Sequence, residues 1–201
     1  MNEKEERRDN TSSRMGMWLF LLSEVLLFGG MFILYSAYRY RNASDFHHAS
    51  GELDLVLGTF NTLILLTSSL TMAVSVSAIQ RGNRRLSAWL LATTLFFGLF
   101  FLLNKGIEWS TKIHHGIYPD SPVLLQRRQG EALFFALYYV MTGLHGLHVL
   151  VGVVLLAVMF CFVIRMRITQ TRFASLENSG LYWHLVDIIW IFLFPLFYLI
   201  A

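Results

Sequence analysis

Long apolar stretches, each about as long as a membrane-spanning helix, alternate with short polar loops along this chain. Five such stretches follow a polar N-terminal segment, and a helix needs about 20 residues to cross a hydrocarbon core of roughly 30 Å. Backbone groups in lipid must pair within their own segment unless strands close into a barrel, and no alternating pattern is present. Helical spans are therefore predicted at 15–38, 53–79, 86–107, 132–164 and 181–201.

This pattern predicts an all-α integral membrane bundle of five transmembrane helices. Residues 1–14 form a polar tail that we expect to be frayed or disordered, and residues 15–201 form one transmembrane domain. The stretch 132–164 exceeds the thickness of a bilayer, so it is expected to tilt or to project from the membrane. The longest loop, 109–130, contains two prolines and is expected to cap the outer face.

The composition supports lipid as the solvent of this chain. It is 55% hydrophobic and only 14% charged, whereas soluble domains carry about 25% charge. The net charge of +3 is small, and its basic residues lie in short loops rather than in a stripe, so nucleic acid is not an expected partner. The single cysteine excludes a disulfide or a cysteine-based metal site within the chain. Acidic residues before a long first stretch favour a retained helix over a cleaved signal peptide.

Basic residues are distributed unevenly between the two sets of loops. The N-terminal segment and the second and fourth loops share one side, and short basic loops stay in the cytoplasm. We therefore predict a cytoplasmic N-terminus and an external C-terminus. Of the 16 basic residues, ten lie on the side of the N-terminus: Lys4, Arg7, Arg8, Arg14, Arg81, Arg84, Arg85, Arg165, Arg167 and Arg172.

Glu24 is the one carboxyl group in the first predicted span. Placing an ionisable side chain in a membrane costs about 2.5–3.5 kcal/mol, so such a group normally faces a protein neighbour or a cavity. Two interpretations stay open for it. It is either a carboxyl that binds a proton or contacts lipid, or a hydrogen-bonded structural acid that fixes the packing of its helix.

His145 and His148 are three positions apart in the fourth span and share a helical face. A metal or haem site is one interpretation, but no set of ligands with a recognisable spacing accompanies them. Hydrogen bonds from neutral imidazoles to another helix are the favoured interpretation, because glycines nearby allow a helix to approach closely. As a hypothesis, Glu24 meets one of these two histidines, since each group needs a buried partner.

His184 and Asp187 share a face of the last span and are predicted to form an intrahelical pair. Trp183 and Trp190 are two turns apart and so lie together. A structural cluster facing another subunit is favoured over a catalytic dyad, because no nucleophile accompanies it.

Four aromatic residues near predicted span ends are expected to be interfacial anchors: Tyr38, Trp89, Trp109 and Trp183.

Glu108 lies just past the third apolar stretch and is expected to form an interfacial pair with Lys105. Glu131 opens the fourth span, where a carboxylate favours the helix dipole. The paired histidines of the outer loops are expected to be solvated: His47, His48, His114 and His115.

The polar residues of the second span indicate that this helix packs closely against other helices. Aromatic residues of the third and fourth spans are expected to face lipid or to pack: Phe96, Phe97, Phe100, Phe101, Phe134, Phe135, Tyr138 and Tyr139.

Five runs, in the same order along the chain, resemble subunit III of the haem-copper respiratory oxidases, which include cytochrome c oxidase and the quinol oxidases. The resemblance covers about residues 15–200. Many members of that family have seven helices, and this chain looks like the five-helix form without the first two. The runs are LLSEVLLFGG at 21–30, FNTLILLTSS at 60–69, KGIEW at 105–109, MTGLHGLHVLVG at 141–152 and YWHLVDIIWIFLF at 182–194.

The resemblance implies a non-catalytic subunit of a proton-pumping terminal oxidase in a prokaryotic plasma membrane. Haem and copper are expected in a partner, the catalytic subunit I, and neither a cofactor nor a catalytic centre is expected in this chain. Bound phospholipid is expected, together with a role in stabilising the catalytic subunit and its proton-uptake region. The carboxyl and imidazole groups of interest are Glu24, Glu108, His145, His148, His184 and Asp187.

Two alternative functions stay open. An accessory subunit of a nitric oxide reductase belongs to the same family, and no feature of the sequence separates the two. A small proton-coupled transporter would use Glu24 and the histidines as a relay, but transporters often show inverted repeats and broken helices. Neither is visible here, apart from Pro195 near the end of the last span.

Overall fold

The computed structural model describes the backbone of residues 3–200 and the side chains of residues 12–200. Within these residues the chain forms seven helices and no strand. Five of the helices are long and apolar enough to cross a membrane, which confirms the all-α fold with five spans. The helices are α1 (Glu3–Arg41), α2 (Ala43–Ser50), α3 (Leu55–Gln80), α4 (Arg84–His114), α5 (Pro122–Leu125), α6 (Gln129–Ile164) and α7 (Ala174–Tyr198).

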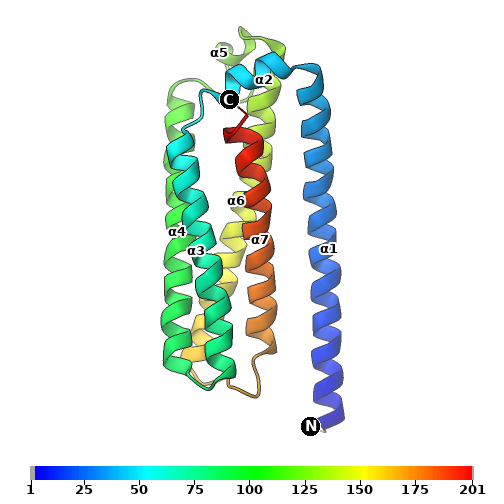
Figure 1. Cartoon of the computed structure of the whole chain (residues 1–201), viewed down its shortest axis with the longest axis vertical. Helices are drawn as coiled ribbons and strands as arrows, with labels where there is room; N and C mark the ends of the chain where they lie inside the picture. The colour runs from blue at the N-terminus through cyan, green and yellow to red at the C-terminus, as the bar shows by residue number, and fades with distance from the viewer. Residues whose placement is uncertain (1–2, 201) are drawn as a thin grey trace.

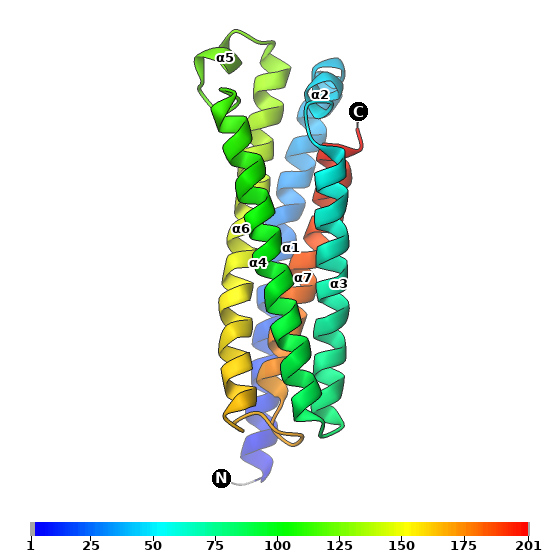
Figure 2. The ribbon, with the colours of Figure 1, turned by 90° about the vertical axis from the view of Figure 1, so that its left-hand side faces the viewer.

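The five long helices divide into a packed bundle and one peripheral helix. Helices α3, α4, α6 and α7 lie side by side, whereas α1 stands at one side of the bundle, next to α6 and α7 (Figure 1). The short helices α2 and α5 lie at the end that carries the C-terminus (Figure 2). The N-terminus and the α3–α4 and α6–α7 connections lie at the opposite end (Figure 2).

Several helices extend beyond the apolar stretches that predicted them. Helix α4 continues to His114, α6 begins at Gln129, and α7 begins at Ala174. In the added turns of α4, Glu108 and Lys112 are buried, so hydropathy alone predicts too early an end for this helix. The polar tail that we expected to be frayed is helical from Glu3. Its Glu, Lys and Arg residues are good helix formers, and extending an existing helix is favourable.

The ends of the helices follow local signals in the sequence. The Asp54 carboxylate accepts a hydrogen bond from the Leu57 amide at the start of α3, and the Asn83 side chain accepts one from Leu86 at the start of α4, as N-cap residues do. Beyond α4, Gly116 adopts a positive φ of 74°, which glycine tolerates best. The loop after it is shorter than predicted and contains α5.

The centre of the bundle is built around Trp183. Its side chain is fully buried and lies in a notch between Gly98 of α4 and Gly152 of α6, where an added Cβ would come within 2.7 Å and 2.8 Å of the indole ring. The indole N–H donates to the Ser68 hydroxyl of α3 at 3.1 Å. The prediction of Trp183 as an interfacial anchor is therefore wrong, because α7 begins seven residues before the predicted span and places Trp183 deep inside the bundle.

Candidate functional site

Glu24 of α1 and His148 of α6 form a hydrogen-bonded pair between the peripheral helix and the bundle. The distance from Glu24 Oε2 to His148 Nε2 is 2.9 Å, and the two side chains are 13% and 14% exposed. His148 Nδ1 lies 2.8 Å from the Leu144 carbonyl oxygen. The hypothesis that Glu24 meets one of the two histidines is confirmed for His148.

The partners of His148 determine how this pair handles protons. A carbonyl oxygen only accepts, so Nδ1 carries a hydrogen and donates it to Leu144. The contact between Nε2 and Glu24 then needs one further proton, held either by the carboxyl group or by the imidazole. The pair can thus exist as two neutral groups or as an ion pair without moving a helix. The Phe28 ring packs edge-on against His148, with 5.4 Å between ring centroids.

His145 lies in a different environment from His148. It is fully buried between the rings of Phe101 and Trp190, at centroid distances of 5.6 Å and 5.2 Å. Neither of its ring nitrogens has a hydrogen-bond partner among the described residues, so the interhelical hydrogen bond expected of His145 is not found there. His148 points to α1 and His145 to the bundle core, and this arrangement does not bring them together as two ligands of one metal ion.

Lys105 and Glu108 of α4 form an ion pair in the interior of the bundle, with 2.9 Å between Nζ and Oε2. Both side chains are buried, at 9% and 5% exposed. The predicted i,i+3 pair of Lys105 and Glu108 is therefore confirmed. Helix α4 continues past residue 107, and the face that carries the pair turns toward α6 and α7, where it contacts Tyr138 and the last residue of α7, Tyr198.

Two tyrosine hydroxyls complete the hydrogen bonding of this ion pair. Lys105 Nζ donates to Tyr138 of α6 at 3.1 Å and to Tyr198 of α7 at 2.8 Å. The same hydroxyls donate to Glu108 Oε1, at 2.7 Å and 2.6 Å. Lys105 thus uses all three of its N–H donors, and the carboxylate accepts three hydrogen bonds. A buried pair is stable only when its remaining donors and acceptors are satisfied in this way.

Sequence reasoning missed the two tyrosines of this cluster. The sequence pattern predicts that Tyr138 faces lipid or packs, and it assigns no role to Tyr198, yet both are buried beside the ion pair. A buried tyrosine hydroxyl normally finds a polar partner, so a tyrosine within an apolar helix was the available signal. Phe101, Phe134 and Phe135 are also fully buried, whereas Phe96 is 61% exposed.

The predicted pair of His184 and Asp187 is not found among the hydrogen bonds of the described residues. Instead, His184 Nδ1 lies 2.7 Å from the Ser69 hydroxyl of α3, and Asp187 is buried beside the same serine. Both side chains of α7 are thus directed to α3 rather than to each other. Trp190 donates from its indole N–H to Thr62 of α3 at 3.0 Å.

The polar residues of α3 pack against the neighbouring helix, as their pattern predicted. Ser75 and Ser87 hydroxyls lie 2.9 Å apart, and Thr71 and Thr94 hydroxyls lie 2.8 Å apart. Asn104 of α4 donates to the Asn61 side chain at 2.9 Å. These contacts join α3 to α4 along their length.

His48, Glu52 and Glu131 form the group of potential metal ligands found among the described residues. Glu131 is buried near the start of α6, and His48 lies on α2 with 3.3 Å between Nδ1 and Oε1 of Glu131. Arg127 contacts both carboxylates: it pairs with Glu52 and lies 3.5 Å from Glu131. A guanidinium therefore already supplies the positive charge that these carboxylates require, and the group is explained as an ion-pair network that attaches α2 to α6.

Comparison with known proteins identifies the family of this chain. The family model of cytochrome c oxidase subunit III matches residues 8–201. A chain of Aeropyrum pernix called "Heme-copper oxidase subunit I+III" is 32% identical over 196 residues, which make up 93% of this chain and 22% of that relative. The "Probable cytochrome c oxidase subunit 3" of Mycobacterium leprae is 33% identical over 192 residues, 92% of this chain and 87% of the relative.

A vertebrate relative shows the same likeness. The "Cytochrome c oxidase subunit 3" of Gadus morhua is 30% identical over 198 residues, which cover 90% of this chain and 67% of the relative. The chain thus spans most of the mycobacterial relative but only 22% of the archaeal one, whose name combines two subunits. With a match that extends over residues 8–201, the chain belongs to the cytochrome c oxidase subunit III family.

Proposed function

We propose that this chain is the non-catalytic subunit III of a proton-pumping haem-copper terminal oxidase and packs against the haem- and copper-bearing subunit I. The observation that carries the proposal is the family match over residues 8–201. The archaeal relative adds support, because its name joins subunits I and III in one chain. Two parts held in one polypeptide have a high effective concentration for each other, which favours direct packing between them.

The proposed location is the plasma membrane of a prokaryote, with the N-terminus in the cytoplasm and the C-terminus outside. The N-terminus and the α3–α4 and α6–α7 connections lie at one end of the molecule (Figure 2). Residues 81–91, which cover the α3–α4 connection and the first turns of α4, and residues 165–173, which form the α6–α7 connection, carry arginines and no acidic residue. Basic connections of this length remain on the cytoplasmic side.

The proposed role is to stabilise subunit I and its proton-uptake region and to hold phospholipid there. Support comes from the distribution of polar and apolar groups. Glu24, Glu108 and His148 have hydrogen-bond partners within the chain, whereas apolar side chains of α1 point outward, with Leu26 68% and Ile33 73% exposed. Such a surface suits lipid or a neighbouring subunit. Electrons would pass through the partner's haem and copper and not through this chain.

The polar residues inside the spans divide into two proposed groups. Glu24 and His148, with Glu108 and His145, would be the groups linked to protons or lipid, and among them Glu24 and His148 have the partly exposed side chains, at 13% and 14%. The proposed structural and subunit-contact group lies on α7 and consists of Trp183, His184, Asp187 and Trp190.

Purification of the tagged chain from its native membrane tests this function. We expect a haem-bearing subunit to co-purify, with a reduced-minus-oxidised haem spectrum and oxygen consumption in the same fraction. An unrelated tagged membrane protein from the same membrane is the control. A chain that purifies without haem protein, or with a nitric oxide reductase in place of an oxidase, would contradict the proposal.

A further inference from the structure

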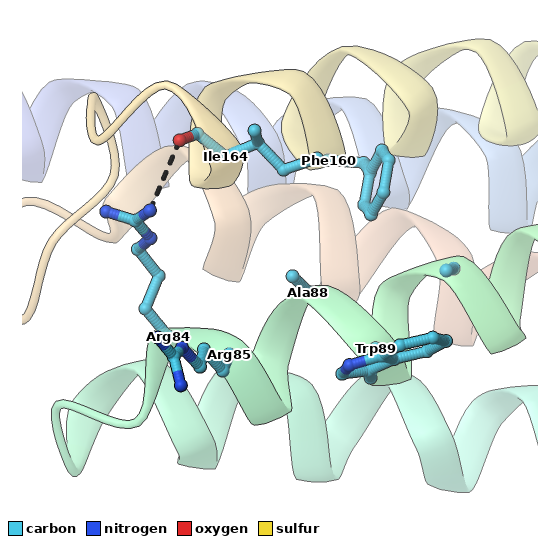
Figure 3. A pocket seen from close by; sticks show the side chains of 7 residues that line it. Arg84, Arg85, Ala88, Trp89, Phe160 and Ile164 are labelled. Carbon is cyan, nitrogen blue, oxygen red and sulfur yellow. Dashed lines mark hydrogen bonds between the residues drawn. The ribbon is translucent and has the colours of Figure 1, made fainter.

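A groove lies between α4 and α6 at the end of the molecule that carries the N-terminus (Figure 3). Its volume is about 330 Å³. Arg84 and Arg85 stand at one end of the groove, and Ala88, Phe160 and Ile164 form part of its walls (Figure 3). The groove therefore combines two positive charges at one end with apolar walls along the rest of its length.

Small residues on α4 create the space. Ala88 and Ala92 both line the groove and are one helical turn apart, so their methyl groups lie one above the other on the same face. Phe160 and Ile164 of α6 have the same spacing on the opposite wall. Trp89 stands beside the groove and is 76% exposed, as expected of an indole at the boundary between lipid and water.

The two guanidinium groups have hydrogen-bond donors to spare. Arg84 donates to the carbonyl oxygen of Ile164 at 3.3 Å (Figure 3), which uses one of its five N–H groups. Arg85 has no hydrogen-bond or ion-pair partner among residues 12–200. The α3–α4 and α6–α7 connections on either side contribute further arginines and no carboxylate: Arg81, Arg165 and Arg167. The two connections therefore add positive charge beside the groove.

We propose that the groove binds one anionic phospholipid, with its phosphate at Arg84 and Arg85 and an acyl chain along Ala88 and Ala92. The inference deepens the lipid-holding part of the proposed function by assigning it a site. Guanidinium forks match phosphate oxygens in geometry and charge. The apolar walls favour a phospholipid over free phosphate, because free phosphate has no acyl chain to pack against them. A zwitterionic lipid has no net charge for the arginines to attract.

Photo-crosslinking on the purified oxidase complex tests the site. The complex is placed in nanodiscs of phosphatidylcholine that contain a trace of phosphatidylglycerol with a diazirine in one acyl chain, and labelled peptides are mapped by mass spectrometry. We expect labelling on residues 88–92 and 160–164, displaced by unlabelled phosphatidylglycerol. A combined Arg84→Gln and Arg85→Gln variant should bind the probe about 25-fold more weakly, since each arginine near a membrane surface contributes about fivefold.

A second variant fills the groove without changing its charge. Ala88→Leu with Ala92→Leu should remove labelling from these peptides. Ala37→Leu on the exposed face of α1 and Arg167→Gln in the α6–α7 connection are the matched controls, and both should label as the wild type does. Because the groove variants change the edge of the bundle, the ratio of haem to this chain is measured in each sample to show that assembly is intact.

Three outcomes would overturn the site. The first is equal labelling by a phosphatidylcholine probe, and the second is unchanged labelling in both groove variants. The third is a crosslink to another protein subunit from a photo-reactive amino acid placed at residue 92. Loss of haem protein from the wild-type sample would instead contradict the proposed function, so the two failures are distinguishable.

Discussion

Helix α1 and the four-helix bundle are made of similarly apolar sequence but are buried very differently. The most apolar stretches of α1 and α4 have the same mean hydropathy of 2.1, yet 11% of the residues are buried in α1 and 28% in α4. Helix α7 is less apolar, at 1.6, and has 50% buried. Lipid is as apolar as a protein core, so hydropathy does not drive helices together; small residues and polar contacts do.

The contacts that hold the two regions reflect this difference. Inside the bundle, Trp183 is fitted into the notch of Gly98 and Gly152, and the Lys105–Glu108 pair joins three helices. Helix α1 instead is attached by separate polar contacts along its length. Arg14 pairs with Glu177, Asn178 donates to the Ser13 hydroxyl, Glu24 contacts His148, and the Tyr35 hydroxyl donates to the Leu196 carbonyl.

The largest effect is expected from removing one half of the buried ion pair. Glu108→Ala leaves Lys105 buried without its counter-charge and should destabilise the bundle by about 3–5 kcal/mol. Equilibrium unfolding of the chain in mixed detergent micelles measures the change. The double variant Lys105→Met with Glu108→Leu should recover much of the loss, because it removes both charges. If the double variant is no more stable than Glu108→Ala, the ion pair does not act as a unit.

Glycine-to-alanine substitutions compare the two regions directly. Gly98→Ala and Gly152→Ala force a methyl group against Trp183 and should each cost about 1–3 kcal/mol in unfolding free energy. Gly29 and Gly30 of α1 have no neighbouring atom within 4 Å of an added Cβ. Alanine at either position should stabilise the chain by about 0.5–1 kcal/mol through helix propensity. Equal effects in the two regions would show that α1 is packed as tightly as the bundle.

A smaller effect is expected at the contact between α1 and α6. Glu24→Ala should weaken this contact by about 0.6 kcal/mol and by at most about 1.7 kcal/mol, the average and the maximum measured for hydrogen bonds between membrane helices. Spin labels on α1 and α6 report the distribution of distances between the two helices. This distribution should be broader in the variant than in the wild type. A double-mutant cycle with His148→Ala isolates the pair, and a coupling energy of zero would mean that Glu24 is held by other contacts.

The smallest effect is expected at the end of α1 that precedes Glu24. The Arg14–Glu177 pair is 54% and 31% exposed, so Arg14→Gln should cost about 0.2–1 kcal/mol, and less at high salt. Hydrogen exchange of the amides near Arg14 should become faster in the variant while that of α7 stays unchanged. Faster exchange throughout the bundle would show that this surface pair supports more than the end of α1.

Several features were predictable from the sequence because they depend on the cost of burial in lipid. The five spans followed from the length and hydropathy of each stretch. A contact of Glu24 with either His145 or His148 followed from the need of each buried polar group for a partner, and the structure shows that the partner is His148. The family was visible in short runs whose order along the chain matches subunit III.

Other features depended on which helix each face meets, and spacing along one helix does not contain that information. His184 and Asp187 share a face, but the face turns to Ser69 of α3. Trp183 is buried because α7 begins earlier than hydropathy predicted. Tyr138 and Tyr198 are 60 residues apart and meet only because α6 and α7 cross beside α4.

The sequence by itself determined that this chain crosses the membrane five times and carries polar groups that require partners inside it. Both conclusions follow from the free energy of placing each segment in hydrocarbon, which depends on composition and length. Only the tertiary structure decided that α1 is peripheral and that Lys105 and Glu108 are buried between α4, α6 and α7. Helix pairing in lipid depends on the fit of small residues and the geometry of hydrogen bonds between helices, and these arise only when the helices are assembled.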